Sequence, residues 1–143
     1  MESLAQRFHL AIHTIKRNIE SDLPLKNDSQ ITRPQLFMLY YINKFGNCKL
    51  SQLADKLEVK PSAISVMIDR LEKAELVKRS YFLVDRRSVF VEITEKGKQL
   101  LRKEKALRNS IIESYLSKLD KEEARLLTEL LEKMIKADDI QSL

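Results

Sequence analysis

The residues of this sequence best suited to bind a polyanion are two adjacent arginines that follow an aspartate. Asp85, Arg86 and Arg87 lie between two runs that favour β-structure, Leu76–Arg79 and Val89–Ile93. Such runs predict the strands of a hairpin, with the arginines at or near its tip. Asp85 can orient a guanidinium through paired hydrogen bonds, and an oriented arginine on a slender hairpin suits the narrow minor groove of DNA. The alternative is that the arginines only keep an exposed tip soluble.

A second candidate surface lies on a short helix that is predicted to start at Pro61. Proline fits the first turn of a helix, where its missing N–H does no harm. The buried stripe of this helix consists of Ile64, Met67, Ile68 and Leu71. The opposite face carries small or polar side chains, namely Ser62, Ala63, Ser65, Val66 and Asp69. A helix that enters the major groove needs such a slim face, whereas a purely structural helix more often carries Glu, Lys and Gln there.

The elements around these surfaces predict a winged helix-turn-helix over residues 48–94. Apolar residues at i, i+3, i+4 and i+7 predict a helix from Leu50 to Leu57, which precedes the helix from Pro61 and the hairpin. The base edges of DNA would then be contacted by Ser62, Ala63, Ser65 and Val66. Phosphates would be held by Lys60 and Arg70, with Ser51 and Lys73 as further candidates. Arg86, positioned by Asp85, would enter the minor groove, and Arg87 would contact the backbone or share that task.

Long helices are predicted on both sides of this segment. The first runs from Leu4 to Asp22, with an apolar stripe of Leu4, Phe8, Ile12, Ile15 and Ile19. Thr94 is predicted to cap a helix that ends near Ser117, and Asp120 a last helix with a broad apolar face. An apolar stripe must be buried against the chain's own core or a partner. Residues 1–22 and 98–140 are therefore predicted to dimerise a single domain, residues 1–143, about a two-fold axis.

Between these parts, an unusually apolar helix is predicted from Thr32, which can cap it, to Phe45, where Gly46 ends it. Its composition places it in the middle of the fold. A cavity for a small-molecule effector, between the first two helices and the DNA-binding segment, could be lined by Phe8, Ile12, Phe37, Tyr40 and Tyr41. For the two tyrosines, ordinary packing with solvent-facing hydroxyls is the favoured alternative.

Composition limits the class of protein further. In a chain of 143 residues, 43% hydrophobic residues are enough for a packed core, and 33% charged residues exclude a membrane-embedded chain. No apolar run approaches the ~20 residues that cross a bilayer. The N-terminus lacks the features of a secretion signal, and the lone Cys48 cannot form an internal disulfide, so a cytoplasmic location is expected. A net charge of +5 permits polyanion binding without establishing it.

Only two glycines and three prolines point to a chain with few tight turns. The expected fold class is mostly α with a small β-hairpin, a winged helix-turn-helix flanked by N- and C-terminal dimerisation helices.

No arrangement of residues points to an enzyme. The sequence contains no phosphate-binding loop, no Ser/His/Asp arrangement and no cluster of Cys and His. His9 and His13 are spaced four residues apart, which suits a metal, but no third His or nearby Cys completes a site. We therefore predict no catalytic residue, no cofactor and no metal.

Several short segments occur in an order and spacing that is specific when taken together. They are Leu53-Ala54, Pro61-Ser62-Ala63-Ile64-Ser65, Asp69-Arg70-Leu71-Glu72, Leu76-Val77-Lys78-Arg79, Asp85-Arg86-Arg87 and Ile93-Thr94-Glu95-Lys96-Gly97. With them, nearly the whole chain resembles the MarR-type winged-helix transcriptional regulators. The resemblance implies an obligate homodimer that binds pseudo-palindromic operators in double-stranded DNA. Many members of this family lose DNA affinity when they sense a small molecule, an oxidant or a metal.

Two positions depart from the family pattern. Members usually carry glycine where Glu58 and Glu75 stand, in the turn of the motif and after its second helix. If those positions are left-handed, each non-glycine residue costs roughly 1 kcal/mol. Some members also sense oxidants through a cysteine in the first helix, whereas Cys48 lies before the motif.

The sequence therefore predicts a sequence-specific DNA-binding transcriptional regulator, with repression as the expected sign. It would bind a pseudo-palindromic operator as a homodimer, and release by a small-molecule effector is left open. One alternative is a winged-helix module for protein–protein assembly. Another is a redox-sensing regulator that acts through Cys48, which would need an exposed thiolate with a low pKa.

Overall fold

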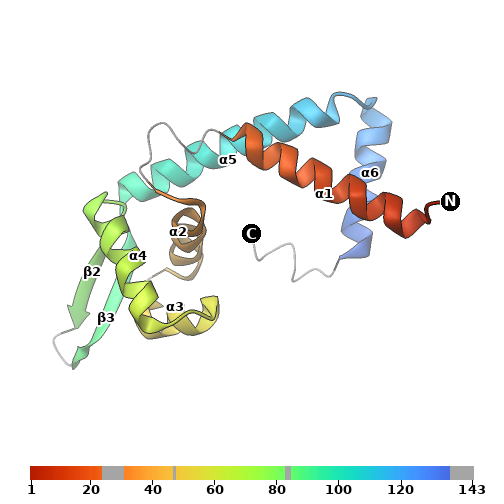
Figure 1. The fold of residues 1–143 in the computed structure, drawn as a ribbon. Helices are drawn as coiled ribbons and strands as arrows, with labels where there is room; N and C mark the ends of the chain where they lie inside the picture. Colours follow the sequence, from red (N-terminus) through yellow and green to blue (C-terminus); the bar gives the residue numbers. More distant parts are fainter. Residues whose placement is uncertain (24–30, 47, 83–84, 136–143) are drawn as a thin grey trace. The chain divides into compact units, whose positions relative to one another are not determined.

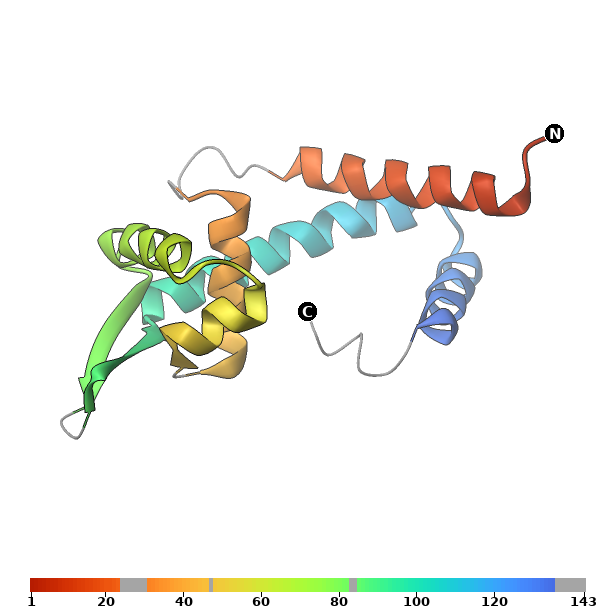
Figure 2. The same ribbon diagram turned by 60° about the horizontal axis from the view of Figure 1, so that its bottom comes forward.

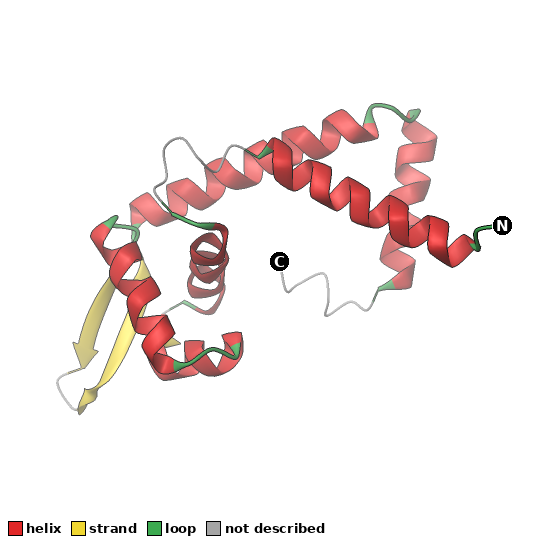
Figure 3. Ribbon diagram, viewed as in Figure 1, coloured by secondary structure: helices red, strands yellow, loops and turns green. Residues whose placement is uncertain are grey.

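The computed structural model describes residues 1–23, 31–46, 48–82 and 85–135, and gives only the backbone of the strand residues among 81–88. The described chain is mostly helical, with one small antiparallel sheet (Figures 1 and 3). Its elements are α1 (Leu4–Asp22), α2 (Arg33–Phe45), β1 (Cys48–Lys49), α3 (Leu50–Leu57), α4 (Pro61–Lys73), β2 (Val77–Phe82), β3 (Asp85–Ile93), α5 (Glu95–Leu116) and α6 (Lys121–Met134). The predicted fold class is confirmed.

The chain divides into two compact units, and the boundary between them falls inside α5. The winged unit, Leu25–Glu104, holds the elements from α2 to β3 and the first part of α5. The helical unit, Met1–Pro24 with Lys105–Leu143, holds α1, the rest of α5 and α6. The expectation of a single domain with separate DNA-binding and dimerisation parts stays a prediction.

The core of the winged unit draws apolar side chains from each of its elements. Helix α2 contributes Met38, Leu39 and Ile42, all fully buried, as its apolar composition predicted. The other fully buried side chains come from α3, α4 and the sheet: Leu53, Ile64, Ile68, Leu71, Val77 and Val91. Burying each such side chain stabilises the fold by about 1.5–3 kcal/mol relative to leaving it exposed. The apolar periodicity of α3 and α4 is therefore explained by this one core.

The sheet contains a strand that sequence reasoning did not find. Strand β1 has two residues and pairs with β3 through Cys48↔Val91 and Lys49↔Phe90, which gives the order β1-β3-β2. Two residues are too few to show an alternating pattern. Strands β2 and β3 form the predicted hairpin, which extends from Val77↔Ile93 to Phe82↔Asp85 and is longer than expected. We call this hairpin the wing; it projects beyond α3 and α4 (Figures 1 and 2).

Hydrogen bonds fix the helix ends of the helical unit. Asp120 accepts the Glu123 N–H at 2.8 Å, and Glu123 accepts the Asp120 N–H at 3.1 Å, which confirms the predicted start of α6. The Glu123 N–H is the main reason why the pKa of Asp120 is lowered. Near the end of α5, the Tyr115 hydroxyl donates to Asp22 Oδ2 at 2.9 Å, so the last turn of α1 is joined to α5.

The apolar stripes of the two terminal helices are uncovered. Helices α1 and α6, both described throughout, contain no buried residue. Their exposed large hydrophobic side chains include Leu4, Phe8, Ile12, Ile15, Leu126, Leu127, Leu130 and Met134. Exposed apolar stripes of this kind are typical of surfaces that pack against a partner.

Two glutamates adopt the left-handed backbone conformation at which glycine is favoured. Glu58 has a φ of 53° and Glu75 a φ of 63°. Glu58 ends α3, where its N–H donates to the Asp55 carbonyl oxygen at 3.3 Å. After α4, the Leu76 N–H donates to the Leu71 carbonyl oxygen at 2.9 Å. Helices α3 and α4 therefore have the left-handed C-terminal residue that is usually glycine, but here it is glutamate.

We expect Glu58→Gly to raise the free energy of unfolding by about 0.5–1 kcal/mol. Glycine removes the strain on Cβ, and this gain exceeds the extra freedom that glycine gives the unfolded chain. The matched control is Glu58→Ala, which removes the same carboxylate, keeps Cβ and should give no such gain. Denaturant titration followed by circular dichroism measures both variants. Equal stabilisation by alanine would assign the effect to the lost charge.

Candidate nucleic-acid interface

The exposed face of α4 carries the small side chains that the sequence predicted. Ser62, Ala63 and Ser65 are exposed, and Val66 retains 52% of its surface. The opposite face is formed by buried Ile64, Ile68 and Leu71, with Met67 half-buried beside them. Side chains this short let the helix backbone come close to an opposing surface. The predicted division of α4 into two faces is confirmed, and its contact with DNA stays a prediction.

Basic and polar residues lie at both ends of this face. Lys60 is exposed directly before α4, and Arg70 and Lys73 are exposed in its last turn. Ser51 is exposed in the first turn of α3. The N-terminus of α4 adds the partial positive charge of the helix dipole. All four predicted phosphate-binding residues are therefore accessible to a polyanion.

The residues predicted at the wing tip are placed by their backbone alone, since their side chains lie outside the described part of the chain. Asp85 pairs with Phe82 and begins β3, and Arg86 and Arg87 follow it in the same strand. The two arginines therefore lie at the distal end of the wing, as predicted. The expected hydrogen bonds from a guanidinium to Asp85 stay a prediction.

Arg79 on β2 joins the wing to α4, a connection that sequence reasoning missed. Its Nη2 lies 2.6 Å from Asp69 Oδ1, and its Nη1 lies 3.0 Å from Glu72 Oε1. Nη2 also donates to the Ser65 carbonyl oxygen at 3.4 Å, and the Arg79 main-chain N–H donates to Glu72 Oε2 at 2.9 Å. We call these four residues the Arg79 clamp. Burial acts to lower the pKa of Arg79, but hydrogen bonds and charges from the two carboxylates outweigh it and raise that pKa.

A second junction fixes the base of the wing to α5. Thr94 Oγ1 donates to the Glu75 carbonyl oxygen at 2.7 Å and accepts the Gly97 N–H at 3.1 Å, so Thr94 caps α5 as predicted. Its main-chain N–H donates to the Leu76 carbonyl oxygen at 3.0 Å. A Cβ on Gly97 would lie 2.6 Å from Ile93 Cγ1 and still nearer to the Leu76 carbonyl oxygen. The wing is therefore fixed at its base to both α4 and α5.

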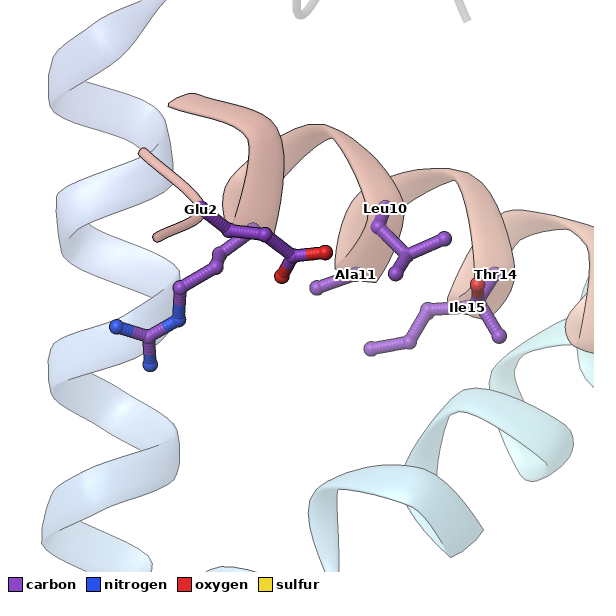
Figure 4. A pocket seen from close by; sticks show the side chains of 6 residues that line it. Glu2, Leu10, Ala11, Thr14 and Ile15 are labelled. Carbon is purple, nitrogen blue, oxygen red and sulfur yellow. The ribbon is translucent and has the colours of Figure 1, made fainter. Parts of the chain in front are cut away.

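The five residues predicted to line an effector cavity are divided between the two units. Phe8 and Ile12 are exposed on α1, whereas Phe37, Tyr40 and Tyr41 belong to α2. Within α2, the rings of Phe37 and Tyr41 meet edge to face with centroids 5.0 Å apart. An open hollow on α1 has a different lining: Glu2, Arg7, Leu10, Ala11, Thr14 and Ile15 (Figure 4). The predicted effector cavity stays a prediction.

Cys48 lies in β1 and has only 8% of its surface exposed. Burial raises the pKa of its thiol, and the charge of Lys56 offsets this only in part. Such a thiol is mostly protonated at neutral pH and is a poor nucleophile. This environment argues against the redox alternative.

The rings of His9 and His13 stack on α1 with centroids 6.2 Å apart. Within the described ranges, no group of three or more His, Cys, Asp or Glu residues is arranged to hold a metal ion.

Among the helices of the described residues, none is both long and apolar enough to cross a membrane.

The chain is similar in sequence and in structure to known proteins of one family. The model of the MarR family matches residues 31–89. The HTH-type transcriptional repressor MdtR of Bacillus subtilis is 32% identical over 137 residues, which cover 95% of this chain and 88% of MdtR. The crystal structure of YusO from Bacillus subtilis is 31% identical, has a TM-score of 0.80 and aligns over 95% of this chain and 99% of YusO.

A further solved structure shows the same fold at lower identity. Streptococcus pneumoniae FabT, whose structure was determined in complex with DNA, is 22% identical with a TM-score of 0.70, over 91% of this chain and 94% of FabT. The fold, with the exposed face of α4 beside the wing, defines a winged helix-turn-helix protein. The sequence identity is sufficient to go one step further: the chain belongs to the MarR family of DNA-binding transcriptional regulators.

We expect Cys48 of the folded protein to react slowly with a chromogenic disulfide reagent at neutral pH. Burial and the raised pKa of its thiol leave little thiolate to attack the reagent. The rate should increase only as the pH rises above the usual pKa of a cysteine thiol. The denatured protein is the control and should react about tenfold faster or more, because its cysteine is exposed. Fast reaction of the folded protein, accompanied by loss of DNA binding, would instead support redox sensing.

Proposed function

We propose that this protein is a sequence-specific repressor of transcription that acts in the cytoplasm and binds a pseudo-palindromic operator as a homodimer. The observation that carries this proposal is the exposed small-residue face of α4, flanked by Lys60 and Arg70 and adjacent to the wing. Membership of the MarR family supports it. So do the name of MdtR, a transcriptional repressor, and the complex of FabT with DNA.

In the proposed complex, α4 lies in the major groove and contacts base edges through Ser62, Ala63, Ser65 and Val66. Lys60 and Arg70 bind phosphates on either side, and the wing carries Arg86 and Arg87 toward the adjacent minor groove. Two such units in a dimer would read half-sites about one helical turn apart, ~34–36 Å. Each phosphate contact contributes ~0.9 to the log–log slope of affinity against salt, so binding should weaken steeply as salt increases.

The dimer is supported by the uncovered apolar stripes of α1 and α6. A closed two-fold interface would bury both stripes against their copies in a second chain and would set the spacing of the two α4 helices. Release of DNA by a small-molecule effector stays a prediction, with Phe8, Ile12, Phe37, Tyr40 and Tyr41 as its candidate residues. Catalysis forms no part of the proposed function.

We expect Arg86→Ala to weaken operator binding by about tenfold, the scale of one lost arginine contact to a groove. Fluorescence anisotropy with duplexes that the wild-type protein selects from random-sequence DNA measures the affinity. The matched control is Lys78→Ala, which removes a cation from the same hairpin, where Lys78 pairs with Glu92 at 2.8 Å. This control should bind nearly as well as wild type. If Arg86→Ala leaves affinity and sequence preference unchanged, the wing does not read DNA, and a role in protein assembly becomes the better explanation of the hairpin.

We expect Leu130→Lys to shift the protein from dimer toward monomer, because a charge would be placed in the apolar face of α6 where the partner chain packs. Light scattering coupled to size-exclusion chromatography measures the molar mass across a dilution series. The control, Glu132→Lys, introduces the same residue on the opposite face of α6 and should stay dimeric. Dissociation of both variants alike would argue for a general effect of charge, and a monomeric wild type would exclude the proposed dimer.

A further inference from the structure

The Arg79 clamp links β2, the first strand of the wing, directly to α4, the helix proposed to enter the major groove. Arg79 contacts three residues of α4, namely Ser65, Asp69 and Glu72. Their spacing of i, i+4 and i+7 places them in one stripe along two turns of the helix. Ser65 also belongs to the proposed base-edge face. A single guanidinium thus contacts α4 beside the surface that would read the operator.

The clamp also holds the main chain of the wing. Strand β2 is an edge strand of the sheet, because β3 lies between it and β1. Main-chain N–H groups on the outer side of an edge strand have no strand partner. Glu72 accepts the N–H of Arg79 with one carboxylate oxygen and binds its guanidinium with the other. Both the backbone and the side chain of Arg79 are therefore tied to α4 by the same carboxylate.

The position of the clamp along the hairpin gives it leverage over the tip. On the partner strand, Arg79 pairs with the fully buried Val91, so the hairpin is anchored in the core at this level. Beyond it, β2 extends three more residues, roughly 10 Å at the rise of a strand. A tilt of about 15° at Arg79 would move the tip by roughly 2–3 Å, which is enough to break a hydrogen bond to a groove.

We propose, on the basis of the DNA binding proposed above, that Arg79 is a positioning residue: it sets the angle of the wing on α4 so that both elements fit one DNA duplex at the same time. Arg79 does not need to touch DNA in this role, and only 16% of its side chain is exposed. Its effect on affinity is instead exerted through the wing, and through Arg86 in particular.

This mode of action predicts energetic coupling between two residues on opposite strands of the hairpin. We expect Arg79→Met to weaken binding to wild-type-selected duplexes by about tenfold, as loss of the wing contact does. In the Arg86→Ala background the same change should cost less than about twofold, because the wing no longer contributes affinity for Arg79 to preserve. Anisotropy titrations of the wild type, both single variants and the double variant complete the cycle.

Two controls separate positioning from charge and from folding. Lys78→Met removes a cation from the neighbouring position on β2 and should change affinity little in either background. Arg79→Met with Asp69→Asn keeps the net charge of the chain unchanged and should lose as much affinity as Arg79→Met alone. Thermal unfolding is measured for every variant. If Arg79→Met does not fold, Arg79→Lys, which keeps the charge but loses the planar fork, carries the same cycle with a smaller expected loss.

The outcomes distinguish this inference from the function on which it rests. If the wild type selects and retains no duplex, the proposed function fails. If the wild type binds and the loss caused by Arg79→Met is the same in both backgrounds, DNA binding stands and the positioning role is overturned. If Arg86→Ala has no effect, the wing is not used, and the positioning role falls with it.

Discussion

The surface of α4 depends on the burial of the opposite side of the same helix. Ser62 and Ser65 contribute little to stability, because their short polar side chains bury no apolar area and serine is not among the stronger helix formers. The helix forms because Ile64, Ile68 and Leu71 are held in the core together with Met38, Leu39 and Ile42 of α2. The apolar helix α2 thus stabilises the exposed face of α4 indirectly, through the core that the two helices share.

The same core limits how freely the wing can move. Val77 and Val91 lie on the two strands of the hairpin and are fully buried at its base, while Thr94 and Gly97 fix the end of β3 to α5. The left-handed Glu75 between α4 and β2 costs roughly 1 kcal/mol, yet it lets the chain turn directly from the helix into the strand. Packing at the base therefore sets most of the orientation of the wing. In the proposed role, the Arg79 clamp sets the remaining tilt of the wing relative to α4.

Local signals account for the parts of the structure that the sequence predicted correctly. Thr32, Thr94 and Asp120 begin helices because their side chains accept nearby N–H groups, and such signals need only a few residues of sequence. The two faces of α4 follow from helical periodicity, which is equally local. The left-handed backbone at Glu58 and Glu75 was indicated only by the family pattern of glycines, because glutamate itself gives no sign of it.

The features that the sequence did not predict all depend on residues that are distant along the chain or lack a period. Strand β1 exists only because β3 offers it a partner about 40 residues later. Arg79 resembles any charged residue of a strand until β2 is placed against α4. Glu104 is another such case: only 5% of it is exposed, and its Oε2 has no hydrogen-bond partner among the described residues, yet nothing in the local sequence marks it as buried.

The contrast between the two units bears on how the proposed dimer would respond to concentration. The winged unit has its own core, whereas α1 and α6 have no buried residue, and α1 is joined to α5 by the hydrogen bond from Tyr115 to Asp22. Most helical stability in proteins comes from packing of an apolar face, so these two helices would gain theirs largely from the partner chain. Association and order in the helical unit would then be one equilibrium, and the apparent stability of this unit would rise with protein concentration. In the proposed complex both α4 helices bind one duplex together, so dilution would reduce operator binding even though each winged unit remained folded.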